Sequence, residues 1–102
     1  MSNQSKPITL QEAQILAQKA LDQIGTPGEM VVDSSKTLEH DFGWFFKADT
    51  VKYLESGDPK YRIPGVGLIA VDRNSRHTQF LPTFMPPERA MEEYIERWKE
   101  KQ

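Results

Sequence analysis

Residues 42–51 read FGWFFKADTV and contain the densest run of large apolar side chains in the chain. Side chains on a strand alternate between two faces, so Phe42, Trp44 and Phe46 are predicted to share one face. Phe45 then falls on the other face, among charged neighbours, and is predicted to be open to water or to a partner. Burial of a large apolar side chain contributes roughly 1.5–3 kcal/mol, so three aromatic rings on one face predict a central strand that anchors the core.

The size and composition of the chain are those of one domain. It has 102 residues, of which 37% are hydrophobic and 27% charged, and no cysteine. A domain of this length buries about 60–70% of its unfolded surface and folds without disulfides. The absence of cysteine excludes a disulfide framework, a thiolate metal site and a cysteine nucleophile. We expect residues 1–7 to form a disordered N-terminal tail and residues 8–102 a single domain.

Charge and hydropathy limit the expected partners. The net charge of -2 argues against general nucleic-acid binding, which needs a basic surface. No run approaches the ~20 apolar residues of a membrane span, so no membrane association is expected. The N-terminus, MSNQSKP, lacks the apolar core of a secretory signal, and we expect a cytoplasmic protein.

The charges are unevenly distributed along the chain. Seven acidic residues oppose three lysines between residues 29 and 58, a local charge of -4, whereas residues 60–76 carry +3. The two regions are expected to differ in potential, either as a field that steers a partner or as two solvated surfaces.

The first segment after the tail has the signals of a packing helix. Thr9 and Glu12 have capping-box spacing, and small or medium apolar residues follow from Leu10 at steps of three and four. Gly25 and Pro27 are predicted to end this helix.

The middle of the chain predicts two antiparallel hairpins. A turn at His40–Asp41 leads into the aromatic strand, and a turn at Asp72–Ser75 joins the last two strands. Residues 52–56 predict one helical turn, and the long loop after it is a candidate contact region. The predicted strands share β-branched or aromatic side chains bounded by turn residues: residues 29–32, 42–51, 66–71 and 76–81.

The last segment predicts a second helix, with Pro87 in its first turn. Its buried stripe is formed by residues at helical spacing: Met91, Tyr94, Ile95 and Trp98. The order helix, two strands, two strands, helix predicts an α+β fold. We expect an antiparallel sheet of about four strands, with the N-terminal and C-terminal helices packed on one face.

The sequence contains no recognisable catalytic constellation. His40 and His77 lie in different hairpins without a second ligand at metal-binding spacing. Asp72 stands at a strand end, where catalytic carboxylates occur, but a hairpin turn explains it equally well. The glycines at 65 and 67 precede a strand, whereas a phosphate cradle precedes a helix. We therefore expect no enzyme activity, no metal and no cofactor.

Three segments carry a family resemblance: GWFFKADTVKYLESGDP (43–59), GVGLIAVDRNSRHTQFL (65–81) and PPERAMEEYIERW (86–98). Together they resemble the immunity protein 35 family of bacterial polymorphic toxin systems, which also contains small proteins described as heat-stable chaperones. The chain departs from the family pattern at Leu68, where proline is common, and at Arg76, where glycine is common. The resemblance implies an α+β domain that binds and neutralises a cognate toxin made by the same cell or its kin.

The leading hypothesis is a toxin-binding protein that occludes the toxin's active site or holds it in an inactive shape. Acidic side chains would speed encounter with a basic toxin surface, and an aromatic ring would supply a desolvated contact. The candidate contact residues are four acids and two aromatics: Asp41, Asp49, Glu55, Asp58, Phe45 and Tyr61. The alternative is a chaperone-like or regulatory protein-binding module without a toxin. The sequence leaves self-association open.

Overall fold

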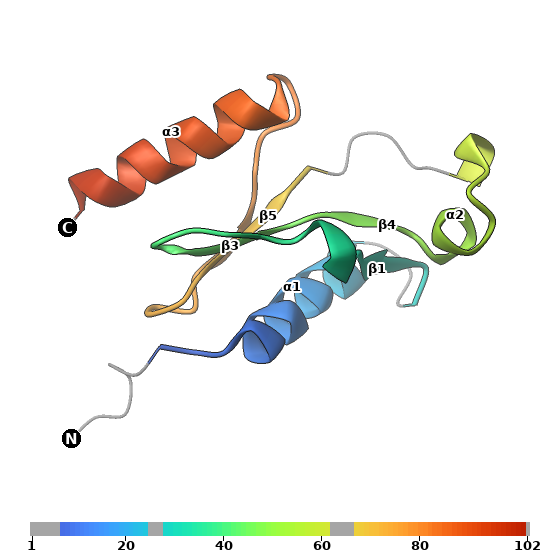
Figure 1. The fold of residues 1–102 in the computed structure, drawn as a ribbon, viewed down its shortest axis with the longest axis horizontal. Helices are drawn as coiled ribbons and strands as arrows, with labels where there is room; N and C mark the ends of the chain where they lie inside the picture. Colours follow the sequence, from blue (N-terminus) through green and yellow to red (C-terminus); the bar gives the residue numbers. More distant parts are fainter. Residues whose placement is uncertain (1–6, 25–27, 62–66, 102) are drawn as a thin grey trace.

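A computed structural model gives the fold and describes residues 7–24, 28–61 and 67–101. The α-helices in these ranges are α1 (Leu10–Ile24), α2 (Val51–Ser56) and α3 (Pro87–Glu100), with short 3-10 helices η2 (Ser34–Lys36) and η3 (Pro59–Tyr61). The strands are β1 (Met30–Val32), β2 (Leu38–Glu39), β3 (Gly43–Phe46), β4 (Ala48–Thr50), β5 (Ile69–Asp72) and β6 (Thr78–Phe80). The α+β class is confirmed (Figure 1). Apart from Pro7, the predicted tail lies outside the described residues, as do Gly25 and Pro27.

The aromatic stretch forms two consecutive strands, β3 and β4, separated at Lys47. β3 is an inner strand of a four-stranded sheet ordered β2-β3-β5-β6, whereas β4 pairs with β1 in a separate two-stranded ribbon. The Lys47 carbonyl accepts a hydrogen bond of 2.7 Å from the Asp33 N–H. The predicted central strand is confirmed for β3, but a single strand through residue 51 is wrong because the pairing partner changes at Lys47.

All strand pairs are antiparallel, and β3 and β5 form the centre of the larger sheet. Phe45 of β3 lies opposite Ala70 of β5 and Leu38 of β2. Ala70 in turn lies opposite Gln79 of β6. The strand predicted at residues 66–71 is present as β5, which lies between β3 and β6 and has residues 69–71 buried.

Helices α1 and α3 cover opposite faces of the four-stranded sheet, as Figure 1 shows. One core lies under α1 and contains Ala13, Ala17, Leu21, Trp44, Phe46, Ile69 and Val71. The other lies under α3 and contains Phe42, Phe45, Ala70, Leu81, Ala90 and Tyr94. The expected sheet and terminal helices are confirmed, but their placement on one face needs correction, since each face of β3 carries its own core.

Phe42 lies in the core under α3, on the opposite side of the sheet from Trp44. The sequence pattern placed Phe42 beside Trp44, but Phe42 packs with Phe45 under α3. β3 begins only at Gly43, whose φ is 155°, so the strand alternation does not extend back to Phe42. The ring centroids of Phe42 and Phe45 are 4.9 Å apart.

The N-terminal helix begins at the predicted capping box. The Thr9 N–H donates to Glu12 Oε1 (2.9 Å), and the Glu12 N–H donates to Thr9 Oγ1 (3.1 Å). Farther along α1, Gln18 Nε2 donates to the Met30 carbonyl (2.8 Å), and Gln18 Oε1 accepts from the Val32 N–H (3.1 Å). Helix α1 therefore covers the sheet and also fixes β1 of the ribbon.

Candidate functional site: the α2–η3 tip

The main candidate site is the end of the molecule formed by residues 50–61, named here the α2–η3 tip. Thr50 is the N-cap residue of α2, and its hydroxyl accepts a hydrogen bond of 3.0 Å from the Tyr53 N–H. The same hydroxyl donates to the Tyr61 carbonyl at 2.6 Å. One side chain thus joins the start of α2 to the end of η3 and fixes the position of Tyr61.

The turn between α2 and η3 is held by local hydrogen bonds. Gly57 ends α2 with φ 74°, and its N–H donates to the Tyr53 carbonyl at 2.7 Å. Asp58 then accepts at Oδ1 from the Lys60 N–H (3.1 Å), while the Asp58 N–H donates to Ser56 Oγ (3.1 Å). The predicted helical turn is confirmed, and local hydrogen bonds connect the successive turns of the tip.

The surface of the tip combines one aromatic ring with charges of both signs. Tyr61 is half-buried, and the ammonium groups of Lys52 and Lys60 lie 5.8 and 5.1 Å from its ring centroid. Lys60 also pairs with Asp58 at 3.7 Å, and Glu55 is exposed. Such exposed pairs contribute little to stability, so these charges are available for a partner.

A hollow of about 560 Å³ opens beside the tip. Its lining comes from the start of the ribbon and from both short helices: Gly28, Glu29, Thr50, Val51, Lys52, Glu55, Lys60 and Tyr61. These groups can form hydrogen bonds, ion pairs and cation–π contacts.

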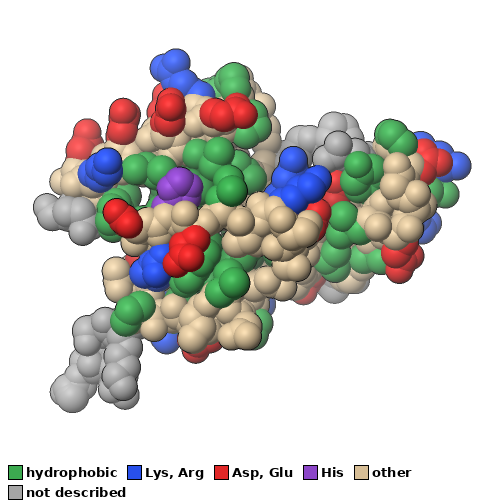
Figure 2. All heavy atoms as spheres, viewed as in Figure 1, with side chains coloured by type: hydrophobic (Ala, Val, Ile, Leu, Met, Phe, Trp, Pro, Cys, Tyr) green, Lys and Arg blue, Asp and Glu red, His purple; other side chains and the backbone are tan. Residues whose placement is uncertain are grey.

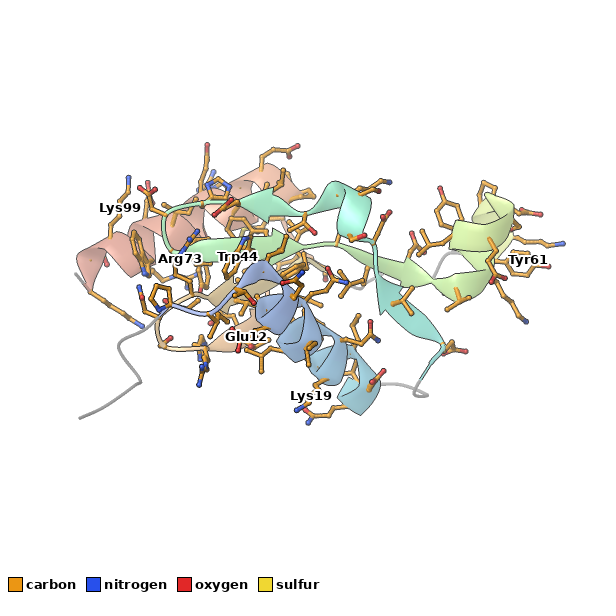
Figure 3. The ribbon with its side chains drawn as sticks, turned by 60° about the horizontal axis from the view of Figure 1, so that its bottom comes forward. Glu12, Lys19, Trp44, Tyr61, Arg73 and Lys99 are labelled. Atoms are coloured by element: carbon orange, nitrogen blue, oxygen red, sulfur yellow. The ribbon has the colours of Figure 1, made fainter. Side chains whose placement is uncertain are left out.

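The structure brings together three of the six predicted contact residues. Glu55, Asp58 and Tyr61 share the α2–η3 tip, which Figure 3 shows at the Tyr61 end of the molecule. Asp41 is exposed in the turn between β2 and β3. Figure 1 shows β3 extending away from α2 toward this turn. The predicted residues therefore form two separate surfaces.

The other two predicted contact residues are buried, which corrects the expectation that they are exposed. Phe45 has 0% exposure because α3 covers its face of the sheet, and its ring centroid lies 5.8 Å from that of Tyr94. Asp49 has 7% exposure, and its Oδ1 accepts from the Thr50 N–H at 2.9 Å. Phe45 supports the core, and Asp49 lies at the base of the tip beside the cap of α2.

A cluster around Arg73 was not predicted from the sequence. Its guanidinium carbon lies 4.7 Å from the Trp44 ring centroid, and Nη2 donates to Glu39 Oε2 (3.0 Å) and to the His40 carbonyl (2.6 Å). Figure 3 shows Arg73 and Trp44 side by side. Glu39 belongs to the acidic region (residues 29–58) and Arg73 to the basic region (residues 60–76). Their ion pair places opposite charges together, so the two regions do not form separate acidic and basic surfaces at this point. No local signal identifies it, because Glu39 and Arg73 meet only through the sheet.

Two ionisable groups among the described residues have clearly displaced pKa values. The Ser35 hydroxyl and N–H donate to the Asp33 carboxylate and lower its pKa. Burial, reinforced by the charge of Asp72, raises the pKa of Tyr94. Neither group belongs to the tip, and both shifts follow from structural roles.

Figure 2 shows acidic and basic side chains along the outer side of α3, with hydrophobic side chains between α3 and the sheet. Within the described ranges, no three His, Cys, Asp or Glu side chains are grouped so as to hold a metal ion. No described helix combines the length and apolar character needed to cross a bilayer.

Comparison with known families gives a match: the model of the immunity protein 35 family matches residues 11–101, nearly the whole chain. The chain belongs to the immunity protein 35 family. No curated protein and no solved structure gives a significant match.

The structure explains one of the two departures from the immunity protein 35 pattern. Arg76, which stands where the family commonly has glycine, has φ 66°, in the left-handed region that favours glycine. The turn before it is held by Asp72 Oδ1, which accepts from the Asn74 and Ser75 N–H groups at 2.8 and 2.9 Å. Leu68, where proline is common, lies just before β5, and its carbonyl accepts from the Leu81 N–H at 2.8 Å. A proline at this position would keep that carbonyl.

Proposed function

We propose that this immunity protein 35 chain binds a cognate bacterial toxin and neutralises it, acting in the cytoplasm during competition between bacteria. The observation that carries the proposal is the family match over residues 11–101. The protein would act by occluding the toxin's active site or by holding the toxin in an inactive shape. No catalytic reaction and no cofactor are proposed.

We propose the α2–η3 tip as a toxin contact. The Thr50 hydrogen bonds fix the backbone of the tip, so the backbone needs little further ordering on binding. Tyr61 supplies a ring that a partner can desolvate further, and Glu55 and Asp58 offer carboxylates to a basic surface. Asp41 would belong to a second contact, because it lies in the turn between β2 and β3 and not in the tip.

The proposal is tested with the toxin encoded beside this chain's gene. Co-expression should restore growth of cells that produce the toxin, and the two chains should co-purify. If the cells survive equally well without this chain and no complex forms with an inactivated toxin, the proposed function is wrong.

The role of the tip is tested separately, by binding measurements on folded variants. Tyr61→Ala should weaken the complex roughly 30-fold or more if the ring is a central contact. Glu55→Lys should slow association, and this effect should diminish at high salt. Glu88→Lys on α3 makes the same charge change at an exposed position away from the tip and serves as the matched control. Equal effects of Glu55→Lys and Glu88→Lys would remove the tip from the interface without affecting the proposed function.

A further inference from the structure

Another hollow, of about 410 Å³, lies between the β5–β6 hairpin and the C-terminal half of α3. The hairpin contributes one acidic and three polar side chains, and the end of α3 contributes two aromatic and two cationic side chains: Asp72, Ser75, His77 and Gln79, then Tyr94, Trp98, Arg97 and Lys101. Figure 1 shows this end of α3 on the side of the molecule away from α2. The hollow is therefore separate from the α2–η3 tip.

The two cations of this hollow have no acidic partner among the described residues. Arg97 and Lys101 stand four positions apart, at the end of α3 and at its C-cap, so they lie on the same side of the helix. Glu93, four positions before Arg97, pairs instead with Arg89 at 3.2 Å. Two cations against one carboxylate give the lining a formal charge of +1 with its histidine neutral, whereas the chain as a whole carries -2.

Tyr94 presents a hydroxyl to this hollow without a hydrogen-bond partner among the described residues. The residue has only 8% exposure, because its ring packs in the core under α3. Burial and then the charge of Asp72 raise the pKa of Tyr94, and the charge of Arg97 lowers it, so the hydroxyl lies near two charges that line the hollow. A buried hydroxyl without a partner is unfavourable, and an acceptor atom on a ligand would satisfy it.

We propose that this hollow is a binding site for a small ligand that carries a carboxylate or a phosphate group. Arg97 and Lys101 hold the anionic group, and a guanidinium can bind two of its oxygens at once. The Tyr94 hydroxyl donates to the same group. The half-buried Trp98 ring forms an apolar wall for the rest of the ligand. The volume is sufficient, because small-molecule pockets typically measure about 300–1,000 Å³.

The carboxylate of the hollow is already engaged in the hairpin turn. Asp72 Oδ1 accepts from the Asn74 and Ser75 N–H groups at 2.8 and 2.9 Å. These bonds hold Asp72 on the hairpin side of the hollow, whereas both cations come from the helix side. Asp72 can therefore accept a hydrogen bond from a hydroxyl or amino group on another part of the ligand.

Cations near the end of a helix also offset the negative end of its dipole, so the test needs a control for this structural role. Lys99 provides it, because it lies in the last turn of α3 and is exposed, but is not part of the lining. Lys99→Gln removes one positive charge from the same turn without changing the hollow.

The test is titration of the purified chain with three probes that share a benzene ring: phenyl phosphate, benzoate and the uncharged benzyl alcohol. At least one of the two anions should shift the indole N–H signal of Trp98 in NMR spectra and saturate with a Kd of about 1 mM or tighter. Binding should weaken as salt is raised. The tighter anion identifies the anionic group, and benzyl alcohol should bind at least about tenfold more weakly.

Substitutions locate the site. Arg97→Gln should weaken binding of the tighter anion roughly tenfold or more, because it removes a charged contact. Tyr94→Phe removes only the hydroxyl and keeps the ring in the core, and should weaken binding roughly three- to tenfold. Lys99→Gln should change the Kd by no more than about twofold. Circular dichroism checks that each variant is folded.

Three results would overturn the inference. The first is the absence of saturable binding of either anion. The second is equally tight binding of benzyl alcohol. The third is an equal loss of binding in Arg97→Gln and Lys99→Gln, which would show a general attraction of anions to the end of α3. None of these results bears on the proposed function, because toxin neutralisation is measured separately.

Discussion

Replacement of Phe45 by alanine tests whether this side chain is buried, as in the structure, or exposed, as the sequence pattern suggested. The ring has 0% exposure and contacts three other rings, with centroid distances of 4.9 Å to Phe42, 5.2 Å to His40 and 5.8 Å to Tyr94. Truncation of a buried phenylalanine lowers the free energy of unfolding by about 3–5 kcal/mol, from lost burial and the cavity left behind. For a domain of this size, that change lowers Tm by roughly 12–40 °C.

The assay is urea unfolding followed by circular dichroism, with Lys47→Ala as the control. Lys47 follows β3 directly but is exposed, so its truncation should change the free energy of unfolding by no more than about 0.5 kcal/mol. Phe45→Leu keeps the side chain apolar and should cost less than Phe45→Ala. If Phe45→Ala and Lys47→Ala unfold at the same urea concentration with the same m-value, the packing of α3 over Phe45 is wrong.

Three further predictions follow from local geometry. Gly43→Ala should destabilise the sheet by several kcal/mol, because a Cβ at Gly43 would lie 2.0 Å from the Val71 carbonyl oxygen; a variant with wild-type Tm would contradict the β3–β5 register. Thr9→Ala removes the N-cap of α1 and should lower the free energy of unfolding by about 0.5–2 kcal/mol, whereas Thr9→Ser should retain most of it. Asp33 has a lowered pKa in the folded state, so its contribution to stability is present above the unfolded value of about 4 and is lost as pH falls below it. The stability advantage of wild type over Asp33→Asn should therefore shrink in acid, and an advantage that grows there would refute the assigned bond to Ser35.

Features that depend on neighbouring residues were predictable from the sequence. The capping box at Thr9, the helical turn that ends at Gly57 and the turn at Asp72 are each formed by hydrogen bonds within four residues, and all three are present. The buried stripe of α3 was also predictable, because a helical spacing of apolar residues fixes which side of that helix is buried.

Three of the six candidate contact residues lie together on one surface, the α2–η3 tip. Glu55, Asp58 and Tyr61 lie within seven positions of one another, so local chain geometry keeps them together at the tip. Phe45 and Asp49 were misassigned because a polar neighbour in the sequence does not show whether a distant helix covers that face. The pairing of Arg73 with Glu39 was missed because the two residues are 34 positions apart.

The sequence by itself determined where the helices, the turns and most of the strands lie, since short-range sterics and hydrogen bonds decide these features. Only the tertiary structure decided which face of β3 each helix covers, and where the chain leaves one sheet for the other. The strand pattern shows that two faces exist, but the free energy that selects their coverings comes from contacts between α3, β3 and β5, whose residues are far apart in the chain. That choice converts Phe45 from an expected contact residue into a core residue.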